Sequence, residues 1–148
     1  MKIKRSKKFK NGVVYCLELQ DGMLIETTDT FLPYDPTNAI GRPQNKLDNT
    51  NLGDRSERWM IGVSTMSGCP VRCKFCATGN MKRYRNLTAD EIVAQVEFAI
   101  NQSGCNPKDA KEFKINYTRM GEPFLNIEAV KEAIRRIKEK YPNTHHYV

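Results

Sequence analysis

The chain has 148 residues, of which 39% are hydrophobic, and it carries a formal net charge of +7. This length suffices for one domain with its own core, and no apolar run approaches the ~20 residues of a membrane-spanning helix. The N-terminus is basic but lacks the apolar stretch of a secretory signal, so the sequence predicts a cytoplasmic protein without membrane attachment.

The N-terminal part, residues 1–57, is predicted to form a basic tail, a β-hairpin and a linker. Six of the first ten residues are Lys or Arg, which favours either contact with nucleic acid or a solvated, frayed terminus. Two β-prone runs, 13–19 and 23–28, flank Asp21-Gly22, a typical hairpin turn. Residues 32–54 are rich in Pro, Asn, Asp and Gly and predict a long surface loop.

Strands and helices alternate in the predicted second part, residues 58–148. The expected elements are a strand at 59–65, a helix from the Thr88–Glu91 capping box to Gly104, a strand at 113–117, a helix from an Asn126 cap to Tyr141-Pro142, and the start of a third strand at 145–148. This order predicts an α/β fold with βα units around a parallel sheet, whose chemistry lies at the carboxyl ends of the strands.

A cysteine loop follows the first of these strands. Cys69, Cys73 and Cys76 have C-x3-C-x2-C spacing, so three thiolates can converge on one metal centre. A structural zinc needs four protein ligands, whereas an iron–sulfur cubane held by three cysteines leaves one iron free to bind another molecule. The spacing and the adjacent aromatic Phe75 therefore favour a catalytic cluster.

A zinc knuckle that borrows a histidine is the alternative for these cysteines. His145 and His146 are the only histidines, and both fall on the predicted third strand. The remaining thiols, Cys16 and Cys105, are expected to be ordinary side chains, since lone cysteines are more often filler than nucleophiles. An odd number of cysteines, three of them clustered, also argues against a disulfide framework.

The second unusual loop, Gly121-Glu122-Pro123, follows the second parallel strand. Because both loops leave from the same rim of the sheet, each supports a functional role for the other. Basic residues surround the cysteine loop and could contact phosphate: Arg72, Lys74, Lys82, Arg83 and Arg85.

Together these residues resemble the radical S-adenosylmethionine (SAM) superfamily. The amino-acid sequences of four segments are similar to those of the adenine methyltransferases of large-subunit ribosomal RNA. The segments are V-S-T-M-S-G-C at 63–69, K-F-C-A-T-G at 74–79, R-N-L-T-A-D-E-I-V at 85–93 and M-G-E-P-F-L-N at 120–126. The resemblance implies a β-hairpin followed by the first βα units of a partial (βα)6 radical SAM barrel.

The resemblance also implies a set of roles. Cys69, Cys73 and Cys76 would ligate a 4Fe-4S cluster, and SAM would bind its free iron. The loop Gly121-Glu122-Pro123 would contact the cofactor, with Glu122 near its ammonium group, and Phe75 would lie along its adenine. The expected reaction is reductive cleavage of SAM, with ribosomal or transfer RNA as a partner and flavodoxin or ferredoxin as a type of electron donor.

Departures from the family pattern leave other functions open. Gly62 stands where the family has a resolving cysteine, and Arg119 stands where it has glycine. The methylated cysteine of the family would lie after Val148, and only two βα units and the start of a third are present, which predicts an incomplete barrel with an exposed sheet edge. The alternatives are a radical SAM enzyme of non-methylating chemistry and a non-catalytic metal- or RNA-binding fragment.

Overall fold

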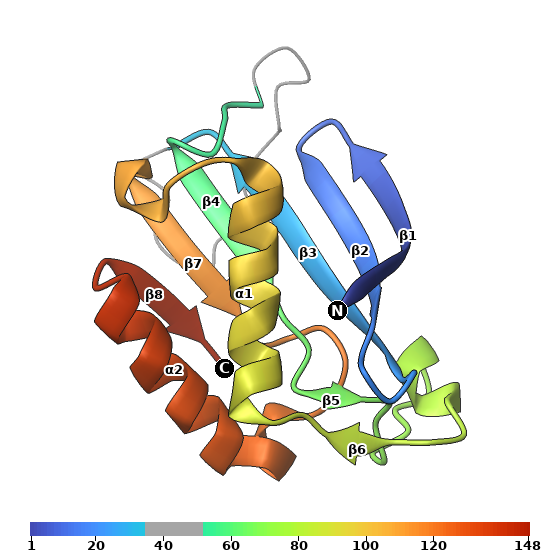
Figure 1. Ribbon diagram of the computed structural model, residues 1–148. Helices are drawn as coiled ribbons and strands as arrows, with labels where there is room; N and C mark the ends of the chain where they lie inside the picture. The colour runs from blue at the N-terminus through green and yellow to red at the C-terminus, as the bar shows by residue number, and fades with distance from the viewer. Residues whose placement is uncertain (35–51) are drawn as a thin grey trace.

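The computed structural model describes residues 1–34 and 52–148. One six-stranded mixed sheet has the order β1-β2-β3-β4-β7-β8, and two helices lie on one of its faces (Figure 1). The sheet strands are β1 Lys2–Phe9, β2 Gly12–Glu18, β3 Leu24–Leu32, β4 Arg58–Gly62, β7 Glu112–Asn116 and β8 Thr144–Tyr147. The helices are α1 Ala89–Ser103 and α2 Ile127–Lys140, and a separate ribbon pairs β5 Met66–Ser67 with β6 Arg85–Asn86.

The predicted alternation of strand and helix is confirmed. β4 pairs in parallel with β7, and β7 pairs in parallel with β8. The cysteine loop follows β4 and the Gly-Glu-Pro loop follows β7, so both leave from the carboxyl edge of the parallel strands, at the bottom of Figure 1. The fold is thus the α/β arrangement expected for the beginning of a barrel.

The N-terminal segment differs from the prediction. Residues 2–9 form β1, which pairs antiparallel with β2, so this segment is a strand rather than a frayed tail. Every residue of β1 is exposed. The strand is held by its backbone ladder with β2, which apolar burial patterns cannot reveal, because it contributes no side chain to the core.

The predicted hairpin is confirmed, but it does not stand apart from the parallel strands. β3 pairs antiparallel with β4, with Thr28 opposite Gly62, and so occupies the edge of β4 that the sequence left open. A strand from the hairpin thus covers this side of the parallel strands, and among the described strands β1 and β8 stand at the two ends of the sheet. Most of the predicted surface loop, residues 35–51, lies outside the described residues.

The core lies between the sheet and the two helices. Alternate residues of the strands point toward the helices, as expected for a half-covered sheet. Fully buried side chains of this core include Leu17, Ile25, Trp59, Ile61, Phe113 and Ile115 from the strands and Ile92, Val96, Ala99, Val130 and Ala133 from the helices. The opposite face of the sheet is not covered by either helix (Figure 1).

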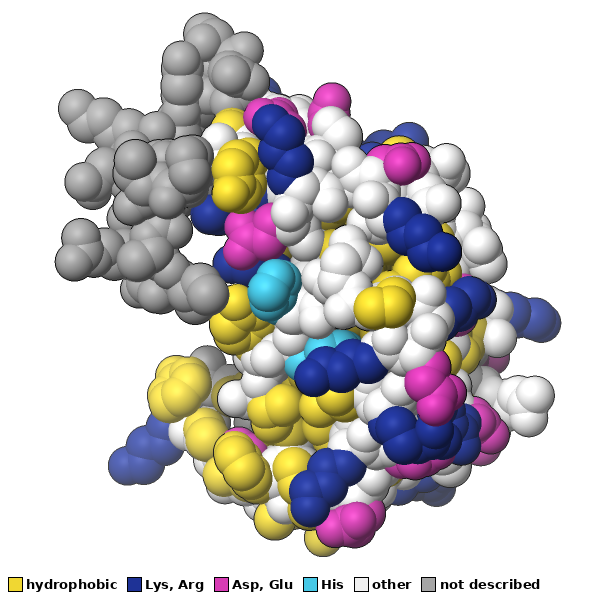
Figure 2. Space-filling model, turned by 90° about the vertical axis from the view of Figure 1, so that its left-hand side faces the viewer, with side chains coloured by type: hydrophobic (Ala, Val, Ile, Leu, Met, Phe, Trp, Pro, Cys, Tyr) yellow, Lys and Arg dark blue, Asp and Glu magenta, His cyan; other side chains and the backbone are white. Residues whose placement is uncertain are grey.

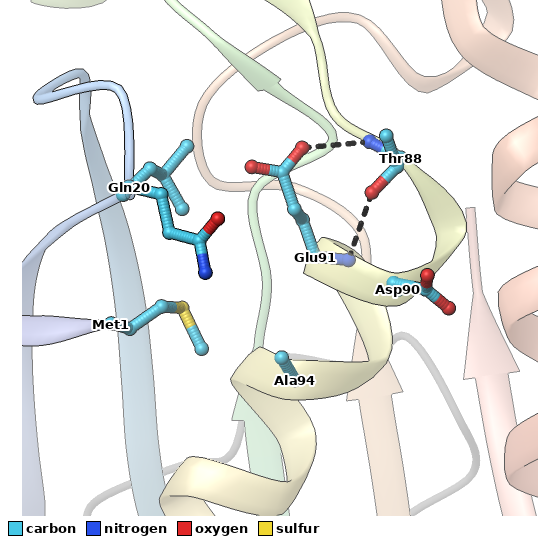
Figure 3. Close-up of a pocket in the computed structure, with 7 residues that line it drawn as sticks. Met1, Gln20, Thr88, Asp90, Glu91 and Ala94 are labelled. Carbon is cyan, nitrogen blue, oxygen red and sulfur yellow. Dashed lines mark hydrogen bonds between the residues drawn. The ribbon is translucent and has the colours of Figure 1, made fainter.

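Helix α1 begins and ends as predicted. The backbone N–H of Glu91 donates to Thr88 Oγ1 at 3.2 Å, and the Thr88 N–H donates to Glu91 Oε1 at 3.0 Å (Figure 3). Gly104 closes the helix in the left-handed conformation, with φ of 69°. Thr88 and Glu91 also line one side of a hollow between α1 and the turn after β2.

Helix α2 begins after Asn126 as predicted, but without the expected capping hydrogen bond. A 3-10 turn, Pro123–Asn126, precedes the helix, and the Asn126 side chain makes no capping hydrogen bond. Instead, its amide donates to the carbonyl oxygens of Thr65 and Leu87, each at 2.8 Å. Asn126 therefore joins the start of α2 to the segments on either side of the cysteine loop.

Among the described residues, no helix is long and apolar enough to cross a membrane.

Candidate functional site

The cysteine loop begins at β5, just after the end of β4. Cys69 and Cys76 are partly buried, Cys73 is exposed, and all three are free thiols. Residues 1–34 and 52–148 contain no group of three His, Cys, Asp or Glu side chains arranged to hold a metal ion. The loop therefore supplies three soft donors in one short segment, which suit an iron–sulfur cluster, although the structure does not arrange them as a finished ligand set.

The environment of Cys76 favours the thiolate that metal binding requires. Hydrogen bonds from the backbone N–H and the hydroxyl group of Thr78, and from the Gly79 N–H, lower the pKa of the Cys76 thiol below its ordinary value. The residues Ala77–Asn80 form the 3-10 turn that directs these donors at the sulfur. The A-T-G sequence after the last cysteine thus has a local electrostatic effect.

The two ends of the cysteine loop meet at Gly68, and Arg85 connects the loop to the hairpin turn and α1. Gly68 has φ of 72°, and a Cβ at this position would lie 2.4 Å from the Arg83 carbonyl oxygen. Arg85 forms ion pairs of 2.8 Å with both Asp21 and Glu91. Arg85 therefore joins the hairpin turn to α1 through these two carboxylates, and its contact with phosphate stays a prediction.

The Gly-Glu-Pro loop packs directly against β5, the strand that leads into the cysteine loop. Gly121 has φ of 96°, and a Cβ there would lie 2.5 Å from the Met66 Cβ and 2.8 Å from the Met66 nitrogen. The N–H groups of Thr65 and Met66 both donate to the Met120 carbonyl oxygen, at 2.9 and 3.2 Å. The two unusual loops are therefore in contact at one edge of the sheet.

The predicted cofactor residues lie on this edge. Glu122 Oε1 accepts a hydrogen bond from the Phe124 N–H at 3.2 Å, and Pro123 begins the following 3-10 turn. Phe75 is 95% exposed, at the tip of the cysteine loop. Figure 2 shows apolar side chains gathered at the lower edge of the molecule, where the two loops lie. The large hydrophobic residues exposed in these loops are Val71, Phe75, Tyr84, Phe124 and Leu125.

A buried polar network that sequence reasoning missed holds the strand end behind these loops. Gln95 of α1 is fully buried, and its Oε1 accepts from the Ser64 N–H and the Thr27 hydroxyl group, at 2.8 and 2.9 Å. Its Nε2 donates to the Ser64 carbonyl oxygen at 2.8 Å. The signal was present in the sequence, since Gln95 interrupts the apolar stripe of α1 between Ile92 and Val96.

Ser64 extends this network to the Gly-Glu-Pro loop. Its hydroxyl group donates to the Glu26 carbonyl oxygen at 2.7 Å and accepts from the N–H groups of Glu26 and Met120, at 3.2 and 3.1 Å. One buried serine thus joins β3, the end of β4 and the loop after β7. This arrangement fixes the rim of the sheet before any ligand binds.

Both histidines lie on β8. His146 Nδ1 and the Tyr117 hydroxyl group are 2.9 Å apart, and the two rings stack with centroids 5.9 Å apart. Burial lowers the pKa of His146 to about 4. Within the described residues neither histidine joins the cysteines in a metal site, so the zinc alternative gains no support.

Gly62 and Arg119, the two departures from the family pattern, are in contact. A Cβ at Gly62 would lie 2.4 Å from Thr28 Oγ1 and 3.0 Å from the Arg119 Cδ. The Arg119 N–H donates to the Val63 carbonyl oxygen at 3.2 Å, and its guanidinium group forms an ion pair with Glu26. The arginine side chain therefore fills the space that a side chain at position 62 would need.

Residues 58–148 match the profile of the 4Fe-4S single cluster domain. The chain belongs to this family. The match covers the parallel strands, both helices and both loops. It agrees with the resemblance of the three-cysteine loop to that of the radical SAM superfamily.

Curated relatives extend the similarity toward the N-terminus. A probable dual-specificity RNA methyltransferase RlmN from Heliobacterium modesticaldum is 38% identical over 81% of this chain and 26% of its own length. The dual-specificity RNA methyltransferase RlmN from Sulfurimonas denitrificans is 33% identical over 95% of this chain and 36% of its own length. The chain thus spans about a quarter to a third of the length of these relatives.

A solved structure shows the same arrangement. A radical SAM methyltransferase from Sphaerobacter thermophilus superposes with a TM-score of 0.65 and 30% identity, over 93% of this chain and 33% of that chain. The comparisons confirm the resemblance to radical SAM RNA methyltransferases, and this family uses an iron–sulfur cluster together with SAM.

Proposed function

We propose that this chain is the cluster- and SAM-binding part of a radical SAM enzyme that acts on RNA in the cytoplasm. The observation that carries the proposal is the contact between the three-cysteine loop segment and the Gly-Glu-Pro loop, made through Met66 and Gly121. A site for a cluster-bound cofactor needs thiolates and a carboxylate on the same rim, and these two loops supply both.

Each predicted residue has a physical role in this proposal. Cys69, Cys73 and Cys76 hold the cluster, and the lowered pKa of Cys76 favours its ligating form. Glu122 orients the amino group of SAM by charge attraction, while the exposed ring of Phe75 covers the adenine. When bound, the cluster supplies the electron that splits a sulfur–carbon bond of SAM, with flavodoxin or ferredoxin as the type of donor; the chain supplies ligands and orientation.

Anaerobic reconstitution with iron and sulfide tests the proposal. We expect about four irons per chain and the visible absorbance of a 4Fe-4S cluster. Addition of dithionite and SAM should then release 5′-deoxyadenosine, measured by chromatography. Cys73→Ala should lose both signals, whereas Cys105→Ala, which removes an exposed cysteine outside the loop, should retain both. One tightly bound zinc per chain without iron would refute the proposal.

A non-methylating reaction is the second candidate. It is favoured by the contact between Gly62 and Arg119, because the position of the resolving thiol has no side chain and its space is filled. Incubation of the reconstituted chain with RNA and SAM carrying a labelled methyl group distinguishes the two. Release of 5′-deoxyadenosine without label in the RNA would support the second candidate, whereas labelled adenine would support methyl transfer.

A further inference from the structure

The face of the sheet not covered by α1 and α2 carries a polar group of side chains around Gly62. Thr28 of β3 and Asn116 of β7 are the cross-strand neighbours of Gly62, and Arg119 packs over it. Within the described part of the chain, neither the side-chain hydroxyl group of Thr28 nor the side-chain amide of Asn116 makes a hydrogen bond. These groups are free to bind a ligand that approaches this face.

Arg119 is the cation of this group. Its side chain is 38% exposed, and its guanidinium group has one acidic partner among the described residues, Glu26, whose side chain is 32% exposed. A guanidinium group has five N–H donors in a planar fork that matches a phosphate group. The ion pair with Glu26 leaves donors unused and holds the group beside Gly62, where no side chain blocks access to it.

Strand β1 extends this face with further cations. Arg5 lies opposite Cys16, which lies opposite Glu26, the partner of Arg119. Lys7 lies opposite Val14, in the row that continues through Thr28 to Gly62. Because residues opposite one another in a sheet share a face, Arg5 and Lys7 of β1 point to the same side as Arg119.

An exposed aromatic ring accompanies these cations. Phe9 of β1 is 51% exposed, and the Lys7 ammonium group lies 5.3 Å from the centre of its ring. Cations along a surface with an exposed ring for base stacking are the features by which proteins bind single-stranded nucleic acid. No acidic residue lies within this strand.

We propose that this face binds a single-stranded segment of RNA, which runs from Arg5, Lys7 and Phe9 to a phosphate-binding position at Arg119. The inference rests on the proposed function for its choice of RNA. Strands β1 and β4 are three spacings of about 4.8 Å apart, or roughly 14 Å, which about four stacked nucleotides can span at about 3.4 Å each. Arg119 thus presents a cation directly over Gly62.

Salt-dependent binding of a short fluorescein-labelled single-stranded RNA tests this inference by fluorescence anisotropy. The slope of log affinity against log salt is negative, and each lost phosphate contact reduces its magnitude by about 0.7 for a single strand. We expect this reduction for Lys7→Met and for Arg119→Met, and an approximately tenfold weaker affinity for Phe9→Ala, from loss of stacking. Lys8→Met is the matched control, because Lys8 is exposed on the same strand but on its other face, and its slope should be that of the parent chain.

Arg119→Lys is the control for a folding defect in Arg119→Met, since lysine keeps the charge and the aliphatic packing over Gly62. It should keep the salt slope but bind RNA more weakly, because an ammonium group lacks the fork. An unchanged slope in folded Arg119→Met, or an equal loss in Lys8→Met, overturns the inference. Cluster assembly and 5′-deoxyadenosine release are measured without RNA, so failure of the proposed function is recognised separately.

Discussion

The replacement Gln95→Leu tests whether the buried polar network holds the rim of the site. Leucine has nearly the size of glutamine but no polar atoms, so the change removes hydrogen bonds without leaving a large cavity. Gln95 loses its bonds to the Thr27 hydroxyl group and to the N–H and carbonyl groups of Ser64, which lie at 2.8 to 2.9 Å and are all buried.

The expected loss of stability follows from these three groups. A buried polar group without a partner costs about 1–3 kcal/mol, and at the lower value the three together destabilise the fold by about 3 kcal/mol. With an m-value of about 2 kcal/mol per molar urea, the unfolding midpoint should fall by about 1.5 M. Circular dichroism during urea titration measures this shift.

Gln102→Leu is the matched control for this experiment. Gln102 lies on the same helix but is exposed, so its replacement should change the free energy of unfolding by no more than about 0.5 kcal/mol. Gln95→Leu should also speed hydrogen exchange at the Met120 amide, since that amide donates to Ser64 Oγ. Equal midpoints for the two variants would show that the network does not stabilise the rim.

Three other replacements probe the fold and the site. Gly121→Ala should lower the melting temperature by several degrees, because its Cβ would lie 2.5 Å from the Met66 Cβ at a strained φ; an unchanged scanning calorimetry trace would contradict this close packing. Asp29→Asn should destabilise the fold by about 3 kcal/mol, because the fully buried carboxylate accepts from Trp59 Nε1 at 2.7 Å and pairs with an arginine; urea unfolding followed by fluorescence of this single tryptophan measures the loss, and a loss below about 1 kcal/mol would refute it. His146→Gln should reduce the acid sensitivity of the fold: burial lowers the pKa of His146 from 6.5 to about 4, so the unfolded state binds the extra proton between these values and stability falls as the pH falls through them. Urea midpoints of both proteins at pH 7 and pH 5 measure this effect, and equal pH dependence would exclude it.

The elements that the sequence predicted well are those with a local cause. The capping box of Thr88 and Glu91, the left-handed Gly104 and the apolar stripes of both helices depend on residues within a few positions of one another. The order of strands and helices followed from the same periodicities. The three-cysteine spacing likewise indicated a cluster loop, because metal ligation by neighbouring thiols is encoded by spacing alone.

Other contacts could not be predicted because their partners lie far away in the sequence. Asn126 has the residue type and the position of a helix cap, yet its side chain makes no capping bond, and its amide donates to Thr65 and Leu87, which are distant in the chain. Arg85 was predicted from its charge alone, and only the folded chain brings Asp21 of the hairpin turn to it. In each case a tertiary contact outweighed the local preference.

By itself, the sequence determined the chemistry that this chain can offer: three thiols and a Gly-Glu-Pro loop, each at the end of a predicted strand. Only the tertiary structure decided how the strands assemble and what surrounds that chemistry. It placed β3 along the open edge of β4 and packed Arg119 over Gly62. The physical reason is that thiol spacing and helix caps act over a few residues, whereas strand pairing and the filling of space join residues that only the folded chain brings together.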